Sequence, residues 1–427
     1  MRAAFLTAAL VAVSLVAGCQ PKSPEARLED QAEQFVKLGL WLGKTHSSEV
    51  DAYFGPPKLD VRDDKDAPPP AELLTRARAL QAELDKDAGT SDSARRQALS
   101  GKVQYFIALL ESITATSRVP FEEEARRLYG VTLPVQDEAV AKAKLKELGE
   151  LLPGPGSVAF RVASYRNRFI VPGDKRQVLF ERALEECRRR TAQHWKLPDN
   201  EKLKVEWTRD VDAAWHRYEG KGQGSLRINP AAVAYMGTAL DLACHEGYPG
   251  HQAQFLLHEA AAGAQGLPVE DTMILLRTPA SVLREGAANF AADLAFPAEE
   301  RLVFERDVLF PLAGMKGADA EKYLVVHRLI NELALSALPI LRDYRNSVIS
   351  FNSATFKLES DALIASPASL LKFTDEYGAY VVGYTVARDQ VRSYVEKTAQ
   401  QSGEDTWTVL GRLLTQLDAS ALSSPTG

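Results

Sequence analysis

Cysteine is scarce in this chain, with three residues in 427. Two of them, Cys187 and Cys244, lie in stretches with helical patterns, so they allow at most one internal disulfide. Cys244 adjoins His245 in an apolar run, where a small buried thiol is the commoner arrangement, and we predict free thiols. A metal bond from Cys244 beside His245 is disfavoured, because neighbouring residues on a helix point about 100° apart.

An excess of positive charge is also absent. The chain carries 51 lysines and arginines against 57 aspartates and glutamates, which gives a net charge of -6 at neutral pH. Nucleic-acid binding needs a concentrated basic face. The three arginines at 188–190 follow Glu185 and Glu186 in a helical stretch, which predicts a solvated face with salt pairs. We expect no nucleic-acid partner, and the sequence predicts no protein partner.

No membrane-spanning helix is predicted at the N-terminus. Residues 3–16 are nearly all apolar and follow Arg2, but the run is too short to span a bilayer and is typical of a targeting signal. The small residues before Cys19 resemble the bacterial lipobox, which implies cleavage before Cys19 and its diacylation. A plain secretory peptide is the alternative. Gln20 further implies outer-membrane retention, so we predict an envelope lipoprotein facing the periplasm, with a signal at 1–18 and a tether at 19–27.

Strand patterns are rare. Leu203–Trp207 and Ser225–Asn229 are the better short alternating runs, and residues 153–156, Pro-Gly-Pro-Gly, form a firm break. We predict a mainly α protein of the α+β kind, with a helical N-terminal region at 28–171 and a second region at 172–420 that holds a small sheet. Helical patterns run over residues 28–42, 70–117, 121–128, 137–152, 175–194, 279–295, 320–346, 369–398 and 406–419.

The most specific feature is a seven-residue motif, His245-Glu-Gly-Tyr-Pro-Gly-His251, which follows the apolar run 238–244. In the His-Glu-x-x-His motif of zincins, two histidines at i and i+4 share one helix face and bind zinc, with the glutamate as general base. Here the second histidine is at i+6, which on an unbroken helix points roughly 120° away. Because Pro249 and Gly250 favour a break after Tyr248, we predict that His251 returns towards His245.

This part of the chain resembles the bacterial domain-of-unknown-function 885 family, whose signature is HExxPGHH followed by EGW-A-x-Y. The resemblance rests on YEGKGQGSLRIN and DLACHEGYPGHQAQ within Tyr218–Gln254, and it runs from about Arg161 to Arg392. It implies a largely helical, zincin-like metallopeptidase with a small sheet beside the active-site helix, a glutamate as third ligand, and a catalytic region at 172–420. Two positions depart from the signature: Gln252 replaces a histidine, and Ala287 replaces the tryptophan.

The resemblance assigns the third ligand to Glu285, in the helical pattern Ser-Val-Leu-Arg-Glu-Gly-Ala-Ala. A catalytic zinc needs three protein ligands and one open position, so we predict zinc held by His245, His251 and Glu285. Taken alone, a glutamate in such a helix is more often a surface residue. His258 lies seven residues after His251 and is the alternative ligand, although a hydrogen-bonded helix residue is the expected arrangement there.

Metal-bound histidines usually donate their second ring N–H to a carboxylate, carbonyl or amide. Asp241 lies one turn before His245 on the same helix face, and Asn289 and Asp293 lie one and two turns after Glu285. We predict that these three side chains orient the ligands.

Other elements are expected to contact the substrate. Ser225, Arg227 and Asn229 lie on the predicted strand after a glycine-rich turn, and we expect an open edge that pairs with an extended peptide backbone. The turn itself lacks a phosphate-loop pattern. Further on, residues 377–384 resemble the family's tyrosine-and-glycine helix, in which Tyr380 or Tyr384 would donate to the oxyanion. Arg388 and Arg392 follow on the same face and are candidates for a peptide carboxylate.

These features predict a lipid-anchored zinc metallopeptidase in which Glu246 takes a proton from water and delivers it to the leaving amine. The motif specifies water activation and leaves the substrate open, so a metal-dependent hydrolase of a non-peptide amide is one alternative. A lipid-anchored binding or scaffold protein that makes no use of the site is the other.

Overall fold

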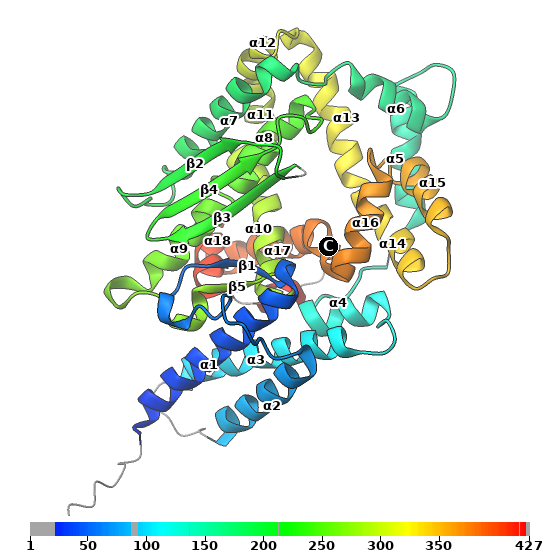
Figure 1. Ribbon diagram of the computed structural model, residues 1–427. Coiled ribbons are helices and arrows are strands. Elements are labelled where there is room, and N and C mark those ends of the chain that lie inside the picture. The colour runs from blue at the N-terminus through cyan, green and yellow to red at the C-terminus, as the bar shows by residue number, and fades with distance from the viewer. Residues whose placement is uncertain (1–21, 87–92, 136, 212, 418, 424–427) are drawn as a thin grey trace, which may run out of the picture.

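The computed structural model describes residues 22–86, 93–135, 137–211, 213–417 and 419–423. Cys19 and the predicted signal lie outside these residues. Helices predominate and two small sheets accompany them, so the prediction of a mainly α protein is confirmed (Figure 1). One continuous apolar core joins side chains from the first described helix to the last.

The N-terminal helices form the base of the molecule in Figure 1. They are α1 (Pro24–Thr45), α2 (Pro70–Lys86) and α3 (Ser93–Thr114). Ser23 caps α1 by accepting a hydrogen bond from the backbone N–H of Ala26. Strand β1 (Val50–Tyr53) then pairs antiparallel with β5 (Met273–Leu275). A segment near the N-terminus thereby reaches the second half of the chain, and this contact brings Asp51 to the site.

A three-stranded sheet covers the motif helices in the order β2-β4-β3. Strand β4 (Gln223–Ile228) lies in the middle, parallel to β2 (Lys202–Trp207) and antiparallel to β3 (Ala214–Gly220). The prediction that the 225–229 strand has an open edge is therefore wrong. The alternating run at 214–220 forms a strand that was not predicted, and it takes the outer position beside the site.

The chain breaks between α8 (Met236–Glu246) and α9 (His251–Ala261), as the motif predicts. Helix α8 packs against α7 (Arg176–Thr191) and against the central helix α10 (Pro279–Ala295). Between α7 and α8, Cys187 and Cys244 form a disulfide with their Cα atoms 5.5 Å apart. The prediction of free thiols is wrong, because helices 57 residues apart in sequence lie side by side.

Three long helical patterns are divided in the structure. The 70–117 pattern holds α2 and α3, and the 320–346 pattern holds α13 (Ala320–Glu332) and α14 (Ala337–Arg345). The 369–398 pattern holds α16 (Pro367–Tyr377), the 3-10 segment η9 (Gly378–Tyr384) and α17 (Val386–Ser402). Gly378 ends α16 with a φ of 60°, a conformation that suits glycine. Because the backbone changes direction there, η9 contacts α10.

The other described helices complete the fold around α10. They are α4 (Phe121–Tyr129), α5 (Glu138–Leu151), α6 (Val158–Asn167), α11 (Ala298–Phe304), α12 (Phe310–Leu312), α15 (Phe351–Asp361) and α18 (Thr406–Gln416), together with short 3-10 and π segments. By length and composition the stretch Gly317–Arg345 is apolar enough to cross a membrane, and 44% of its most apolar window is buried. A core helix has the same composition, so this stretch does not identify a membrane span.

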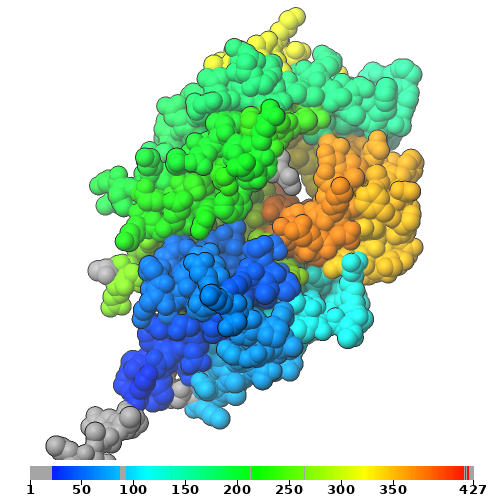
Figure 2. Space-filling view, in the orientation of Figure 1, coloured from blue at the N-terminus to red at the C-terminus, as the bar shows by residue number. Residues whose placement is uncertain are grey.

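Figure 2 shows the surface hollowed where the green sheet segment, the blue N-terminal segment and the orange segment around α16 meet. Strands β1 and β3 and segment η9 each contribute side chains to the cavity at the candidate site. The site is thus assembled from the N-terminal segment, the three-stranded sheet and the C-terminal segment that holds η9.

Candidate metal centre

The break between α8 and α9 brings the two motif histidines together. Helix α8 ends at Glu246 with Gly247 as its C-cap, a cis peptide bond joins Tyr248 to Pro249, and α9 begins at His251. The imidazole centroids of His245 and His251 lie 4.7 Å apart with their planes nearly perpendicular. The predicted break is confirmed, and it begins at Gly247.

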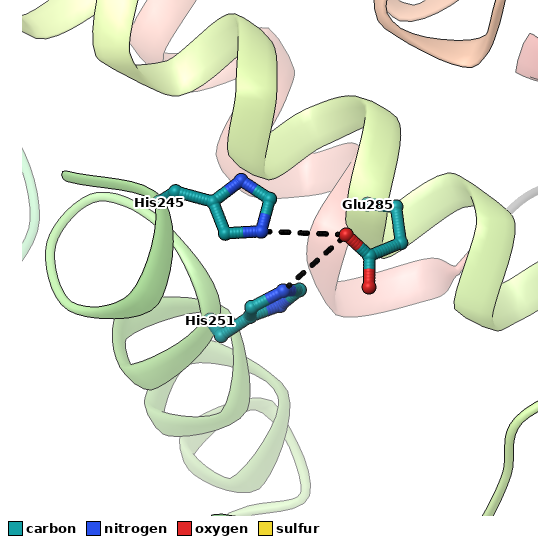
Figure 3. Close-up of side chains that lie close together, drawn as sticks. All are labelled: His245, His251 and Glu285. Atoms are coloured by element: carbon teal, nitrogen blue, oxygen red, sulfur yellow. Dashed lines mark ion pairs between the residues drawn. The ribbon is translucent and has the colours of Figure 1, made fainter. Parts of the chain in front are cut away.

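Glu285 of α10 points between the two imidazoles, as Figure 3 shows. Its Oε2 atom lies 3.3 Å from Nε2 of His245 and 3.7 Å from Nε2 of His251. One possible ligand atom from each residue falls within 4.8 Å of the others. The structure therefore brings the three predicted ligands together.

These distances fit a metal ion with three protein ligands. In a tetrahedral site with ligand bonds of about 2.1 Å, two ligand atoms lie about 3.4 Å apart. Oε2 of Glu285 is buried and has no hydrogen-bond partner of good geometry among the described residues. A buried carboxylate oxygen in this position lacks a partner that a cation would supply.

The charges around this centre favour a cation as well. Burial alone would raise the pKa of Glu285, but the charge of His251 and the contact with His245 hold it well below its usual range. Burial would likewise lower the pKa of His245, yet Glu285 and Glu246 raise it above its ordinary value. Two carboxylates thus stabilise positive charge at the ring nitrogens, where a metal ion would place it.

Of the three predicted orienting residues, Asn289 is the one that acts on a ligand, because its side chain helps to raise the pKa of His245. Asp241 and Asp293 do not orient the histidines. Asp241 accepts from Arg301 at 2.7 Å and contacts Nε2 of His327 at 2.9 Å. Asp241 does lie one turn before His245, but side chains from α11 and α13 bind its carboxylate instead.

Asp293 lies too far along α10 to reach the histidines. It accepts hydrogen bonds from Arg388 of α17, at 2.7 Å, and from Arg392. These two arginines line a second cavity of about 670 Å³, together with Asp293. The prediction that they face the substrate beside the metal ligands is therefore wrong, since α17 turns their side chains towards Asp293.

The candidate metal ligands line a cavity of about 310 Å³. Glu246 lies in its wall directly after His245 in sequence, where a general base of the zincin type is expected. Ala214, the first residue of β3, and Ala213 directly before it line the same cavity. Ser225, Arg227 and Asn229 are absent from its described lining, and their side chains bond instead to Glu219, Asp210 and the carbonyl of Val211.

Both predicted tyrosines reach the site through η9. The hydroxyls of Tyr380 and Tyr384 donate to Oε1 of Glu285 at 3.3 and 3.2 Å, and Tyr384 also stacks against His245. They hold the carboxylate by one oxygen, so that Oε2 faces the histidines. Burial raises the pKa of each tyrosine well above its ordinary value, so both remain O–H donors at neutral pH.

One of the two positions that depart from the family signature, Gln252, has a clear contact. Gln252 is fully buried, and its Oε1 lies 3.0 Å from Nε2 of His216. His216 stacks against His251, with ring centroids 6.0 Å apart. Burial lowers the pKa of His216 to about 3, so the ring is neutral and can donate to Gln252. His216 of β3 thus packs against the ring of His251, and Gln252 holds His216 in place.

Three ionisable side chains in the cavity wall were not assigned to the site from the sequence: Asp51, His216 and Arg284. Asp51 accepts a hydrogen bond from the indole of Trp215 at 3.4 Å, and burial raises its pKa. No local pattern indicates Asp51, because the pairing of β1 with β5 decides its position. The sequence did contain a signal for the other two residues. His216 and Tyr218 alternate on one strand face, and Arg284 is a lone arginine in the apolar 281–288 stretch.

The glycine-rich turn binds an internal carboxylate. Glu259 of α9 accepts from the backbone N–H groups of Lys221 and Gly222 at 2.8 and 2.9 Å, and from the hydroxyl of Tyr218. His258 lies at Thr415, where its Nδ1 is 3.1 Å from the carbonyl oxygen. Its expected role as a hydrogen-bonded helix residue is confirmed.

No family model matches the chain, and no curated protein matches it. The likeness to the domain-of-unknown-function 885 family remains a prediction that rests on the motif residues. The geometry of the site itself is therefore the basis for assigning a function.

Proposed function

We propose that this chain is a zinc-dependent, zincin-like hydrolase that cleaves peptide bonds, with His245, His251 and Glu285 as the metal ligands. The observation that carries the proposal is the convergence of these three side chains, within 4.8 Å, beside Glu246. Two histidines and one carboxylate are a common donor set of catalytic zinc, which keeps a fourth position open.

A zinc ion bound there would supply Lewis-acid chemistry and lower the pKa of a water molecule. Glu246 faces the same cavity, so its carboxylate is available to take a proton from the attacking water and deliver it to the leaving amine. The hydroxyls of Tyr380 and Tyr384 lie on the ligand side of the cavity. On carbonyl attack, one of them would shift from Glu285 to donate to the developing oxyanion.

An extended peptide is the substrate class that the sheet favours. Within the described residues, β3 pairs with β4 alone, and its first residues line the cavity. The outer edge of β3 offers backbone donors and acceptors to which a peptide can add as a further strand. We therefore assign the pairing with a peptide backbone, which was predicted for the 225–229 strand, to β3.

We further propose that a lipid anchor at Cys19 holds the enzyme in the cell envelope, facing the periplasm.

Metal content and turnover test this proposal separately. We expect about one zinc per chain in purified protein by elemental analysis, and none after both His245 and His251 are changed to alanine. Glu246→Gln should keep the metal and lose about 10²–10⁴-fold in peptide hydrolysis, because the amide preserves shape while removing the base. Glu147→Gln, an exposed change on α5, is the matched control and should leave hydrolysis unchanged.

Turnover is read by mass spectrometry of a mixed peptide library, with and without a chelator. A wild-type protein without transition metal sinks the site assignment, and near-normal hydrolysis by Glu246→Gln sinks the mechanism. Metal-loaded protein that leaves every peptide intact would support the alternatives, a non-peptide amide hydrolase or a binding protein.

A further inference from the structure

An arginine lies in the wall of the candidate metal cavity. Arg284 directly precedes Glu285 on α10, is 6% exposed, and lines the same cavity as the three candidate ligands. Its guanidinium lies over the ring of Phe255, 4.7 Å from the ring centroid, and Phe255 lines the cavity as well. The arginine is therefore held against an aromatic wall beside the site.

Arg284 differs from two arginines that are partly buried, Arg277 and Arg301, in having no anionic partner among the described residues. Arg277 binds Glu49, and Arg301 binds Asp241 and Glu305. Among the residues that the structure describes, no carboxylate lies within ion-pair distance of Arg284, and no hydrogen bond of its side chain is found.

The two carboxylates whose charges act on Arg284 are engaged elsewhere. Asp271 pairs with Lys102, and Asp51 accepts from Trp215. An arginine guanidinium stays charged at neutral pH. A buried charge without a partner is unfavourable, and a ligand anion would relieve that cost.

We propose that Arg284 is a specificity-determining residue that binds a carboxylate of the substrate inside the metal cavity. A guanidinium presents a planar fork of N–H donors that matches both oxygens of a carboxylate. The carboxylate can come from the end of a peptide chain or from an acidic side chain, since both present the same group. This inference rests on the proposed function, because it names the substrate that the hydrolase would select.

The size of the cavity limits where cleavage occurs. A volume of about 310 Å³ is at the low end of the range of about 300–1,000 Å³ for ligand pockets. A carboxylate held by Arg284 in so small a space keeps the neighbouring peptide bond close to Glu285. We therefore infer cleavage near the carboxylate, which favours short peptides or sites next to an acidic residue.

Binding to the inactive enzyme tests the inference without turnover. Full-length Glu246→Gln protein, loaded with zinc, is titrated calorimetrically with trialanine, with trialanine amide and with Ala-Glu-Ala amide. We expect the trialanine acid or the glutamate peptide to bind about tenfold to a hundredfold more tightly than trialanine amide, because a hydrogen-bonded charge pair contributes that much. A preference for trialanine identifies a terminal carboxylate, and a preference for the glutamate peptide identifies an acidic side chain.

Adding Arg284→Gln should abolish this preference, while Arg284→Lys should keep part of it. Arg388→Gln removes an arginine from the second cavity and is the matched control, which should leave the preference intact. Circular dichroism and zinc content of each variant distinguish the loss of the carboxylate-binding guanidinium from a loss of the fold. The comparison of the three peptides on Glu246→Gln protein needs no arginine variant, so it tests the inference even if the Arg284 variants do not fold.

Equal affinity for all three probes, no measurable binding of any, or a preference that survives Arg284→Gln overturns the inference. Peptide hydrolysis by the wild type is measured alongside. If the carboxylate preference holds while no peptide is cleaved, the proposed peptidase function fails and the role of Arg284 stands.

Discussion

The substitution Gly250→Ala should separate metal binding from folding. A Cβ atom on Gly250 would lie 1.8 Å from the carbonyl oxygen of His245 and 2.3 Å from that of Cys244. Real Cβ atoms keep at least 3.0 Å from such atoms, so the connection between α8 and α9 must shift by about 1.2 Å. Metal–ligand distances tolerate about 0.2 Å, and His251 directly follows the shifted residue. We expect the variant to fold with its core intact and to lose zinc.

Elemental analysis after dialysis against a weak chelator measures the zinc, and thermal unfolding followed by circular dichroism measures the fold. Gly101→Ala is the matched control, because its Cβ meets nothing within 4 Å and it lies inside helix α3. That variant should bind zinc as the wild type does and gain about 0.4–1 kcal/mol in unfolding free energy. Gly250→Ala protein that retains one zinc with wild-type affinity would refute the argument that glycine at this position sets the histidine geometry.

Two further predictions concern acid stability and membrane attachment. Glu186, which is 6% exposed, binds Arg189 and Arg190. Its hydrogen bond from Arg189 outweighs the effect of burial and lowers its pKa to about 2. Because its pKa is lower in the folded than in the unfolded protein, this carboxylate contributes at most about 3 kcal/mol to the free energy of unfolding. That contribution is present above about pH 5 and is lost towards pH 2. Denaturant curves of wild type and Glu186→Gln should converge with falling pH, and a separation that stays constant contradicts this. Cys19→Ser should move the protein from membranes to the soluble fraction of cells, whereas a mutant that still sediments with membranes has a different anchor.

Local backbone structure could be predicted from the sequence. Helix periodicity and capping act over a few residues, so the bounds predicted for α10 agree with the structure. The Pro-Gly pair between His245 and His251 predicted the break that brings the imidazoles together, because proline and glycine change the backbone at their own positions. The β-pattern at 203–207 was likewise confirmed as β2.

The sequence did not predict which side chains bind one another, because these contacts depend on which helices lie side by side. Asp241 was placed on the correct helix face, but Arg301 and His327 come from elements far along the chain and bind it there. Arg388 and Arg392 were assigned to the substrate, and Asp293 binds them instead.

The sequence by itself determined the mainly helical fold, the break in the motif, and the two histidines with Glu246 beside them. The tertiary structure decided that Glu285 completes the triad, that β3 forms the edge at the site, and that Arg284 and Asp51 face the cavity. Backbone conformation is set by neighbouring residues, whereas a site carboxylate or arginine is defined by contacts between segments that the sequence keeps far apart. For this reason a residue such as Asp51, on a short strand paired with one more than 200 residues away, carries no local signal of its position.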